Sequence, residues 1–586
     1  MQNKIKYYYF ETIVFILFSC YLYYIIEPVL LYVVQDNVFF TTTGFFLDHI
    51  KYPGGILDYL NSFSIELLRI SWIGALLLTA VALAIVLISK QVFKQFGIKE
   101  NMFYLHLMPL IFLTALYSNH TSEIYFLASF GTLITLLAFM VFNRWQSSSI
   151  TKNTLLGWIL AFVVYYTAVD MVYFFLFLCI IRILNVNKES LLQTFFLLLF
   201  PLIIPWLSYT YFFVITHKEA YFKIMFPENI DPVFILMLLT YLVITMGLRF
   251  YKDKGIKRLK NPFFAMPIIL LCLAGSAYYT FDPENKQTDQ YIYLAREHDW
   301  DEIISLSQHT KAFDNLRIFL INRAMCHKRI LLTKFFSIPQ NLKFDGLVLS
   351  RDYSIALPLL KSDFYMDIGL INQANHWAHE ALSIKGETPL ILKRLAEVNL
   401  IKNKLDAADM FLRKLKNTIW EKQWAVSYLE ALQKDATLAS DQEIQSERHL
   451  VLTEDFVTWG SFVQLDLEKI LKQGKGTRMT YEYLMIYYLL DKKYKNFLAL
   501  LPSIGNYGYQ KIPKLFAEAF LVYLSSTKAS IKPYEKIIDP VYIVRFNEFQ
   551  RLLKSAGENF QGMQTQLDQQ FGDTYWYYLI TQEKKL

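Results

Sequence analysis

The chain has 586 residues, of which 54% are hydrophobic, 17% aromatic and only 19% charged. The length alone would predict three or four soluble domains, but so little charge cannot cover their surfaces, so part of the chain is expected to face lipid. The 21 glycines and 17 prolines are few beside 48 phenylalanines and 40 tyrosines, which excludes disordered, collagen-like and coiled-coil classes.

Long apolar runs are confined to the chain before about residue 281. Nine runs are long enough, or nearly so, to cross the roughly 30 Å of hydrocarbon in a bilayer. The predicted spans are 12–34, 67–88, 102–118, 122–142, 154–169, 171–187, 190–215, 233–249 and 263–281. The pair 154–169 and 171–187 can alternatively form one long helix or one re-entrant unit. Glu27, followed by Pro28, predicts a kink in the first span.

Basic residues in the connections predict the orientation of these spans. One side carries fifteen Lys and Arg residues, whereas the other carries four: Lys51, Arg69, Lys218 and Lys223. Because cytoplasmic loops are enriched in Lys and Arg, the first side, with the N-terminus, is predicted to be cytoplasmic, most simply at a bacterial inner membrane. The same asymmetry explains most of the net charge of +7, so no nucleic-acid partner is predicted.

Residues 282–586 are predicted to form a separate, extracytoplasmic domain of amphipathic helices, following the membrane domain 1–281. Ala374 and Ala408 are 34 positions apart, and the same spacing relates Ala378 to Leu412 and Ala381 to Leu415. This pattern resembles tetratricopeptide repeats, in which small residues let paired helices approach closely. The predicted fold class is therefore all-α, a polytopic transmembrane bundle followed by a helical-repeat domain. A concave repeat surface implies a protein or peptide partner.

The outer side of the membrane domain is rich in carboxylates. Its connections contain nine acidic residues: Asp36, Asp48, Asp58, Glu66, Glu123, Asp170, Glu219, Glu228 and Asp231. The first outer connection, 35–66, is long and amphipathic, with two short predicted helices separated by Tyr52-Pro53-Gly54-Gly55. Helices of this composition suit the headgroup region of a bilayer.

This plan resembles the membrane-embedded glycosyltransferases of the C superfamily. The resemblance implies sugar transfer from a lipid-phosphate donor at the outer leaflet, with an acid of the first outer loop, Asp36 or Asp48, and a group of the second, Glu123 or His120, in catalysis. Asp170 is a further catalytic candidate, because an acid in a tight turn between spans is costly unless it is paired or hydrated. Lys51, Arg69, Lys218 and Lys223 are the phosphate-binding candidates, and a divalent cation is a further option.

A second interpretation needs no catalysis: the bundle anchors the helical-repeat domain as a scaffold of an envelope complex, and the outer carboxylates are merely solvated. A transporter is less favoured, because the spans lack paired broken helices and buried charge clusters. No dinucleotide, phosphate-loop or zinc-protease motif is found, and the four scattered cysteines predict no metal site. Convergence of Asp36, Asp48, Glu123 and Asp170 would favour an enzyme, and their dispersal a scaffold.

Overall fold

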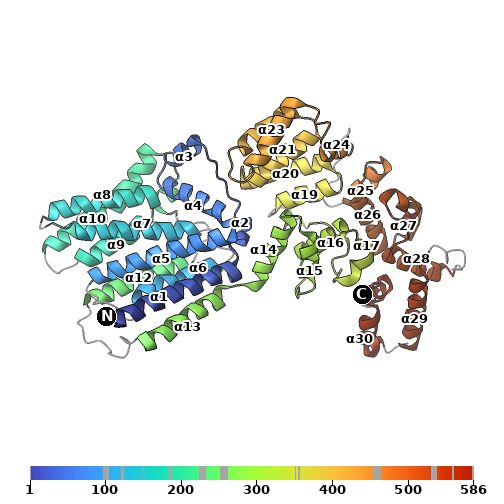
Figure 1. The fold of residues 1–586 in the computed structure, drawn as a ribbon, viewed down its shortest axis with the longest axis horizontal. Helices are drawn as coiled ribbons and strands as arrows, with labels where there is room; N and C mark the ends of the chain where they lie inside the picture. The colour runs from blue at the N-terminus through green and yellow to red at the C-terminus, as the bar shows by residue number, and fades with distance from the viewer. Residues whose placement is uncertain are drawn as a thin grey trace. The chain divides into compact units, whose positions relative to one another are not determined.

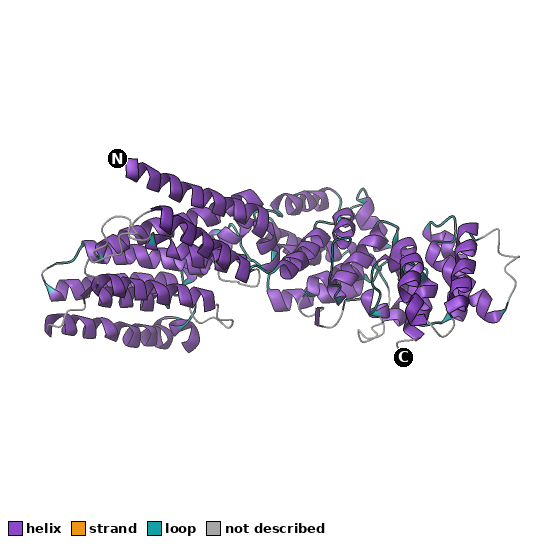
Figure 2. Cartoon of the chain, turned by 90° about the horizontal axis from the view of Figure 1, so that it is seen from below, coloured by secondary structure: helices purple, strands orange, loops and turns teal. Residues whose placement is uncertain are grey.

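The computed structural model describes most of the chain as α-helix. The described residues are 2–96, 104–119, 125–147, 149–183, 188–223, 232–250, 262–349, 352–353, 357–452, 463–528, 538–556 and 560–583. Within these ranges there is no strand, and Figure 2 shows helices joined by loops throughout. Contacts divide the chain into two units, Met1–Asp289 and Gln290–Leu586.

The first unit begins with a broken helix. Helix α1 (Gln2–Tyr21) continues as a π-helical turn (Leu22–Ile26), and α2 (Pro28–Val34) follows Glu27, whose φ of 56° interrupts the helical path. Pro28 lacks a backbone N–H and starts the new helix, which confirms the predicted kink. The Glu27 carboxylate Oε1 pairs with Lys286 Nζ at 2.6 Å.

The remaining helices of this unit follow the apolar runs and the first outer connection. They are α3 (Thr43–His49), α4 (Gly55–Leu68), α5 (Ser71–Gln95), α6 (Met108–Ser118), α7 (Tyr125–Arg144), α8 (Ile150–Ala168), α9 (Met171–Ile183), α10 (Lys188–Leu207), α11 (His217–Tyr221), α12 (Pro232–Phe250), α13 (Pro262–Thr280) and α14 (Pro283–Arg296), which leads into the second unit. Helices α8 and α9 are separate helices packed against each other, so the alternative of one long helix over 154–187 is wrong.

Five described helices are long and apolar enough to cross a membrane. They cover Tyr9–Ile26, Ser71–Gln95, Tyr125–Arg144, Glu189–Phe212 and Pro232–Arg249, and shorter apolar helices cover Leu105–Ser118, Met171–Ile183 and Pro267–Thr280. The count of nine spans stays a prediction.

Helices α5, α7, α9 and α12 lie side by side around one apolar core (Figure 1). Leu78, Phe139 and Phe175 are fully buried in it. On the outside of α5, Leu76 and Leu87 are exposed, as expected for a helix that faces lipid rather than water.

The second unit is also built of short helices. They are α15 (Trp300–Ser307), α16 (Asn315–His327), α17 (Leu331–Lys334), α19 (Pro358–Asp367), α20 (Ile371–Lys385), α21 (Pro389–Ile401), α22 (Leu405–Leu415), α23 (Lys422–Lys434), α24 (Gln442–Arg448), α25 (Val463–Lys472), α26 (Arg478–Leu490), α27 (Tyr494–Leu500), α28 (Lys514–Thr527), α29 (Pro540–Ala556), α30 (Phe560–Phe571) and α31 (Tyr575–Glu583).

Successive helices from α19 to α23 pack against one another (Figure 1). The residues that share the 34-position spacing are buried at these contacts: Ala374, Ala378 and Ala381 of α20, and Ala408, Leu412 and Leu415 of α22. Thr388 caps α21, where its hydroxyl accepts from the Ile391 N–H and satisfies a donor at the helix start. The periodic small and apolar residues therefore form helix–helix contacts.

Candidate functional site

Asp48, the first-loop acid of the sequence interpretation, lies at the surface. It is near the end of α3, and its Oδ1 pairs with Lys51 Nζ at 2.7 Å, with both side chains 70% exposed. The hydrogen bond from Lys51 lowers the pKa of Asp48. Both are candidates from the sequence, and the structure pairs them with each other in open solvent, where an ion pair contributes little stability.

The other predicted residues are spread over the same part of the unit. Asp36 is exposed in the segment between α2 and α3, Arg69 is half-buried at the end of α4, and Lys218 is exposed on α11. Glu123 and His120 lie outside the described residues. These positions do not by themselves form a site.

Asp170 lies in the turn between α8 and α9 and is only 1% exposed. Its Oδ2 accepts a hydrogen bond of 3.0 Å from the backbone N–H of Lys223. The preceding Val169 has a φ of 41°, a strained value for a β-branched residue. Two residues predicted independently, Asp170 and Lys223, are thus brought together, with the carboxylate bound to the main chain of the lysine.

The side chain of Lys223 points to a different carboxylate. Its Nζ pairs with Asp58 Oδ2 of α4 at 2.6 Å, and the two side chains are 23% and 24% exposed. The hydroxyl of Tyr52 donates to the same Asp58 oxygen at 2.9 Å, and Lys223 Nζ lies 4.8 Å from the centre of the Tyr52 ring. Burial and the nearby Asp58 carboxylate raise the pKa of Tyr52, so its hydroxyl remains a neutral donor.

Close backbone contacts hold the first outer connection against the end of α8. The Gly54 N–H donates to the Tyr166 carbonyl at 2.8 Å, and the Tyr166 hydroxyl donates to the carbonyl of Ile50. A Cβ at Gly54, which has a φ of 83°, would lie 2.8 Å from Val169 Cγ2 and 3.0 Å from Lys223 Nζ. Glycine is therefore required here both by the backbone angle and by the approach of its neighbours.

Helix α11 positions Lys223 from the other side. Thr216 and Glu219 form a capping box at its start, and these hydrogen bonds from Thr216 lower the pKa of Glu219. The Tyr165 hydroxyl donates to the Ala220 carbonyl at 3.1 Å, which ties α11 to α8. We call Tyr52, Asp58, Asp170 and Lys223 the outer-loop cluster, after the connection 35–66 that contains Tyr52 and Asp58 and was predicted to be an outer one.

The outer-loop cluster combines two carboxylates, an ammonium group and a phenol. Asp58 and Lys223 are partly exposed, whereas Asp170 is buried. A carboxylate can take a proton from a hydroxyl, and a lysine can bind a phosphate. Asp58 belonged to the nine outer acids but was not selected from the sequence, and Tyr52 was read only as part of a turn. The available signal was their position around the turn: Tyr52 directly precedes Pro53-Gly54-Gly55, and Asp58 comes three positions after Gly55.

The second unit contains a different ionic cluster, which is built around the buried side chain of Arg323. Arg323 Nε and His327 Nε2 both contact Asp367 Oδ2, at 2.5 and 3.1 Å, and Arg394 pairs with Asp363 at 2.7 Å. Although burial alone would raise it, the pKa of Asp367 is held low by Arg323 and His327. Arg323 Nη1 has no hydrogen-bond partner among the described residues. We call these five residues the inner-helix cluster.

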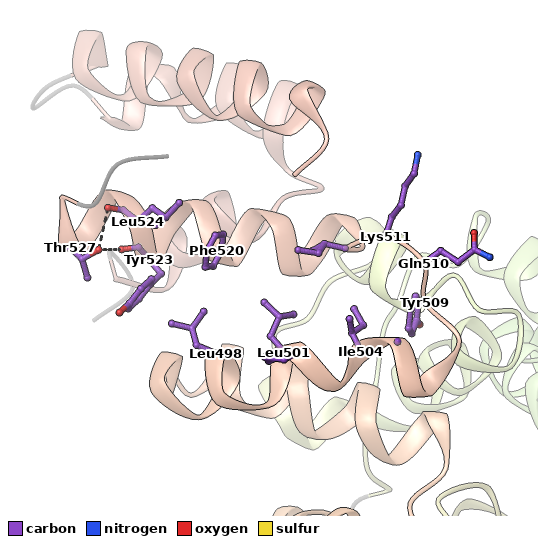
Figure 3. A pocket seen from close by; sticks show the side chains of 13 residues that line it. Leu498, Leu501, Ile504, Tyr509, Gln510, Lys511, Phe520, Tyr523, Leu524 and Thr527 are labelled. Atoms are coloured by element: carbon purple, nitrogen blue, oxygen red, sulfur yellow. Dashed lines mark hydrogen bonds between the residues drawn. The ribbon is translucent and has the colours of Figure 1, made fainter. Parts of the chain in front are cut away.

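An apolar pocket of about 1050 Å³ opens elsewhere in the second unit. Figure 3 shows Leu498, Leu501 and Ile504 facing Phe520 and Leu524 of α28 across it. Two polar groups of its wall bond within the protein: the Thr527 hydroxyl donates to the Tyr523 carbonyl, and the Tyr509 hydroxyl donates to Glu482. The wall therefore favours apolar contact over directed polar recognition.

The part of the chain that the structure describes is thus all-helical, with several helices apolar enough to cross a membrane. The chain belongs to a family of unknown function, because the model of the "Family of unknown function (DUF6057)" matches residues 3–582. No curated protein and no solved structure matches the chain. The family is therefore known, whereas its activity must be argued from the residues.

Proposed function

We propose that the protein is an integral membrane glycosyltransferase that moves a sugar from a lipid-phosphate donor at the outer leaflet. The observation that carries this proposal is the contact of Lys223 with Asp58, in a partly exposed position where Asp58 also accepts a hydrogen bond from Tyr52. The second unit is then extracytoplasmic, on the same side as the cluster, with a protein or peptide as its partner.

In this reaction the acceptor hydroxyl attacks the anomeric carbon of the donor sugar. The new glycosidic C–O bond forms while the bond from that carbon to the phosphate oxygen breaks, and the phosphate leaves with the electron pair. The Asp58 carboxylate accepts the proton of the acceptor hydroxyl, and the Lys223 ammonium group stabilises the leaving phosphate. Tyr52 and Asp170 position these two groups through the hydrogen bonds described above.

The proposal is tested by replacing the two reacting side chains in the native host. Asp58→Asn and Lys223→Met are each expected to reduce the transferred sugar in surface glycans or glycolipids at least 100-fold, the scale of general acid–base and electrostatic effects. Glu27→Gln and Lys286→Met are matched controls, because they break another partly exposed ion pair of 2.6 Å in the same unit. Wild-type glycans from correctly inserted Asp58→Asn and Lys223→Met proteins would contradict the proposal.

The same assay ranks the carboxylates predicted from the sequence. Asp36→Ala, Asp48→Ala, Glu123→Ala and Asp170→Ala are compared with Asp58→Asn at equal protein level in the membrane. If Asp48→Ala abolishes transfer and Asp58→Asn does not, the base is Asp48 and the role given to Asp58 is wrong.

A scaffold of an envelope complex is the second candidate function. The apolar pocket of the second unit favours it, because a cavity of this size and lining suits apolar side chains of a protein partner. The scaffold predicts that Leu501→Asp and Leu524→Asp abolish co-purification of a partner while Asp58→Asn has no effect on surface glycans.

A further inference from the structure

The ion pair between Lys223 and Asp58 leaves neither group free for the chemistry proposed above. Lys223 Nζ is 2.6 Å from Asp58 Oδ2, so a phosphate cannot take the same position on the ammonium group while the pair persists. We propose that Asp58 occupies the phosphate-binding position on Lys223 and that the phosphate group of a lipid ligand displaces it. This rests on the proposed function, whose donor carries the phosphate as a diester and whose lipid product carries it as a monoester.

The main chain of Lys223 is fixed independently of its side chain. Its N–H donates to buried Asp170 at 3.0 Å, and the N–H of Phe222 donates to the Lys218 carbonyl at 2.7 Å. The four-carbon side chain can therefore change its partner without movement of the backbone. The exchange of one oxyanion for another on Lys223 therefore needs only a rearrangement of its side chain, while the backbone stays in place.

The surroundings of Lys223 Nζ suit a second oxyanion. Lys223 Nζ lies close to Gly54: a Cβ added at this glycine would be only 3.0 Å from the nitrogen. Lys223 Nζ also lies over the ring of Tyr52. With both side chains about a quarter exposed, the pair is accessible from outside. The phosphodiester of the donor carries one negative charge on two free oxygens, so it can pair with the ammonium group as Asp58 does. The phosphomonoester of the product carries more charge and one more acceptor oxygen.

The exchange also releases the proton acceptor. Once the phosphate holds Lys223, Asp58 retains the hydrogen bond from the Tyr52 hydroxyl and no longer pairs with the lysine. Its carboxylate is then free to accept a proton from the acceptor hydroxyl. Arrival of the lipid phosphate would thus precede and enable proton removal, which protects the site from reaction without a donor.

Binding of a non-transferable probe tests the exchange directly. Full-length protein in phosphatidylcholine nanodiscs is titrated with farnesyl phosphate, and its dissociation constant is measured by native mass spectrometry. Asp58→Asn is expected to bind about tenfold more tightly, because the internal competitor has gone, and Lys223→Met about tenfold more weakly. Lys223→Arg keeps the positive charge and is expected to bind more tightly than Lys223→Met, which shows that the loss in Lys223→Met comes from the charge.

The matched pair Glu27→Gln and Lys286→Met is expected to leave binding unchanged. Inorganic phosphate is titrated in parallel. If the variants rank in the same order of affinity for inorganic phosphate, the headgroup alone is recognised. If they rank in this order only for farnesyl phosphate, the lipid is required. Either order supports the exchange. Binding by Asp58→Asn that equals or falls below wild type overturns it, as does unchanged binding by Lys223→Met.

Failure of this inference differs from failure of the proposed function. If Asp58→Asn binds the probe more tightly but retains normal glycan transfer, the exchange stands and the glycosyltransferase assignment falls. If Asp58→Asn and Lys223→Met both abolish glycan transfer without the expected changes in probe binding, the glycosyltransferase assignment stands and the exchange is wrong.

Discussion

Lys223 in the first unit and Arg323 in the second each hold a carboxylate in an ion pair, but their surroundings are opposite. The side chain of Lys223 is 23% exposed and pairs with Asp58, whose carboxylate also accepts a hydrogen bond from Tyr52. The side chain of Arg323 is only 2% exposed and belongs to the inner-helix cluster, which joins α16, α19 and α21. The chain thus contains one ion pair at an accessible position and another inside a stack of helices.

The difference indicates which cluster is suited to function and which to structure. A buried charge whose partner is removed stays desolvated and uncompensated, whereas a partly exposed charge can be rehydrated or meet a ligand. We therefore expect substitutions in the inner-helix cluster to change stability, and those in the outer-loop cluster to change binding and activity.

The largest expected effect on stability is that of Arg323→Met. It leaves Asp367 buried without its arginine, which should destabilise the second unit by about 3–5 kcal/mol. Hydrogen–deuterium exchange of peptides from α16 and α19, measured in the full-length protein, should rise strongly. Arg413→Met, which breaks an exposed pair with Asp409 on α22, is the control and should leave exchange unchanged. Equal exchange in Arg323→Met and wild type would show that the cluster is not structural.

Asp170→Ala should have the next largest effect, because it removes the acceptor of the Lys223 N–H. An unsatisfied buried donor costs about 1–3 kcal/mol, so exchange should increase locally over residues 216–223. Asp170→Asn retains a side-chain oxygen and should stay close to wild type. An equal increase in both variants would mean that the negative charge of Asp170, rather than its acceptor oxygen, orders this segment.

A smaller effect is expected from Glu447, near the inner-helix cluster. Burial, with Asp367 nearby, raises its pKa from 4.5 to about 7. The folded unit therefore binds this proton more tightly than the unfolded chain, so the stabilisation is fully present below pH 4.5 and is lost as the pH rises through 7. Glu447→Gln should stabilise the unit at pH 8 by about 1 kcal/mol, with little gain at pH 4.5.

Thermal unfolding at both pH values measures this difference, with the exposed Glu430→Gln of α23 as the control. A gain by Glu447→Gln that is the same at pH 4.5 and pH 8 would exclude titration of this carboxyl as its cause.

The smallest expected effect on stability is that of Lys223→Met. A partly exposed ion pair contributes less than about 1 kcal/mol, so the unfolding temperature should change little while probe binding falls. If Lys223→Met lost as much stability as Arg323→Met, the outer-loop cluster would be structural in the same way as the inner-helix cluster.

The sequence predicted the helices better than the contacts between them. Apolar runs identify helical segments because composition and length are local properties, and Pro28 marked the break at Glu27. The ends were less predictable: a span was expected from 102, whereas helix α6 begins at Met108, next to Pro109. Helix ends depend on capping and tertiary contact, which local composition does not determine.

The outer-loop cluster was predicted only in part. Asp170 attracted notice because an acid in a tight turn needs a partner, and Lys223 because basic residues are rare on that side. Asp58 met no such criterion, since an acid in the first turn of a helix is ordinary. It joins the cluster because a lysine 165 positions later reaches it, and such a contact is visible only in three dimensions.

Val169 and Gly54 have a consequence for how this part of the chain can vary. Val169 keeps an unfavourable backbone angle, and its methyl group fills the space that a side chain at Gly54 would need. Glycine at 169 would relieve the strain but leave a void beside Gly54, and any larger residue at 54 would meet the methyl group. The two positions therefore constrain each other, and members of the family should change them together or not at all.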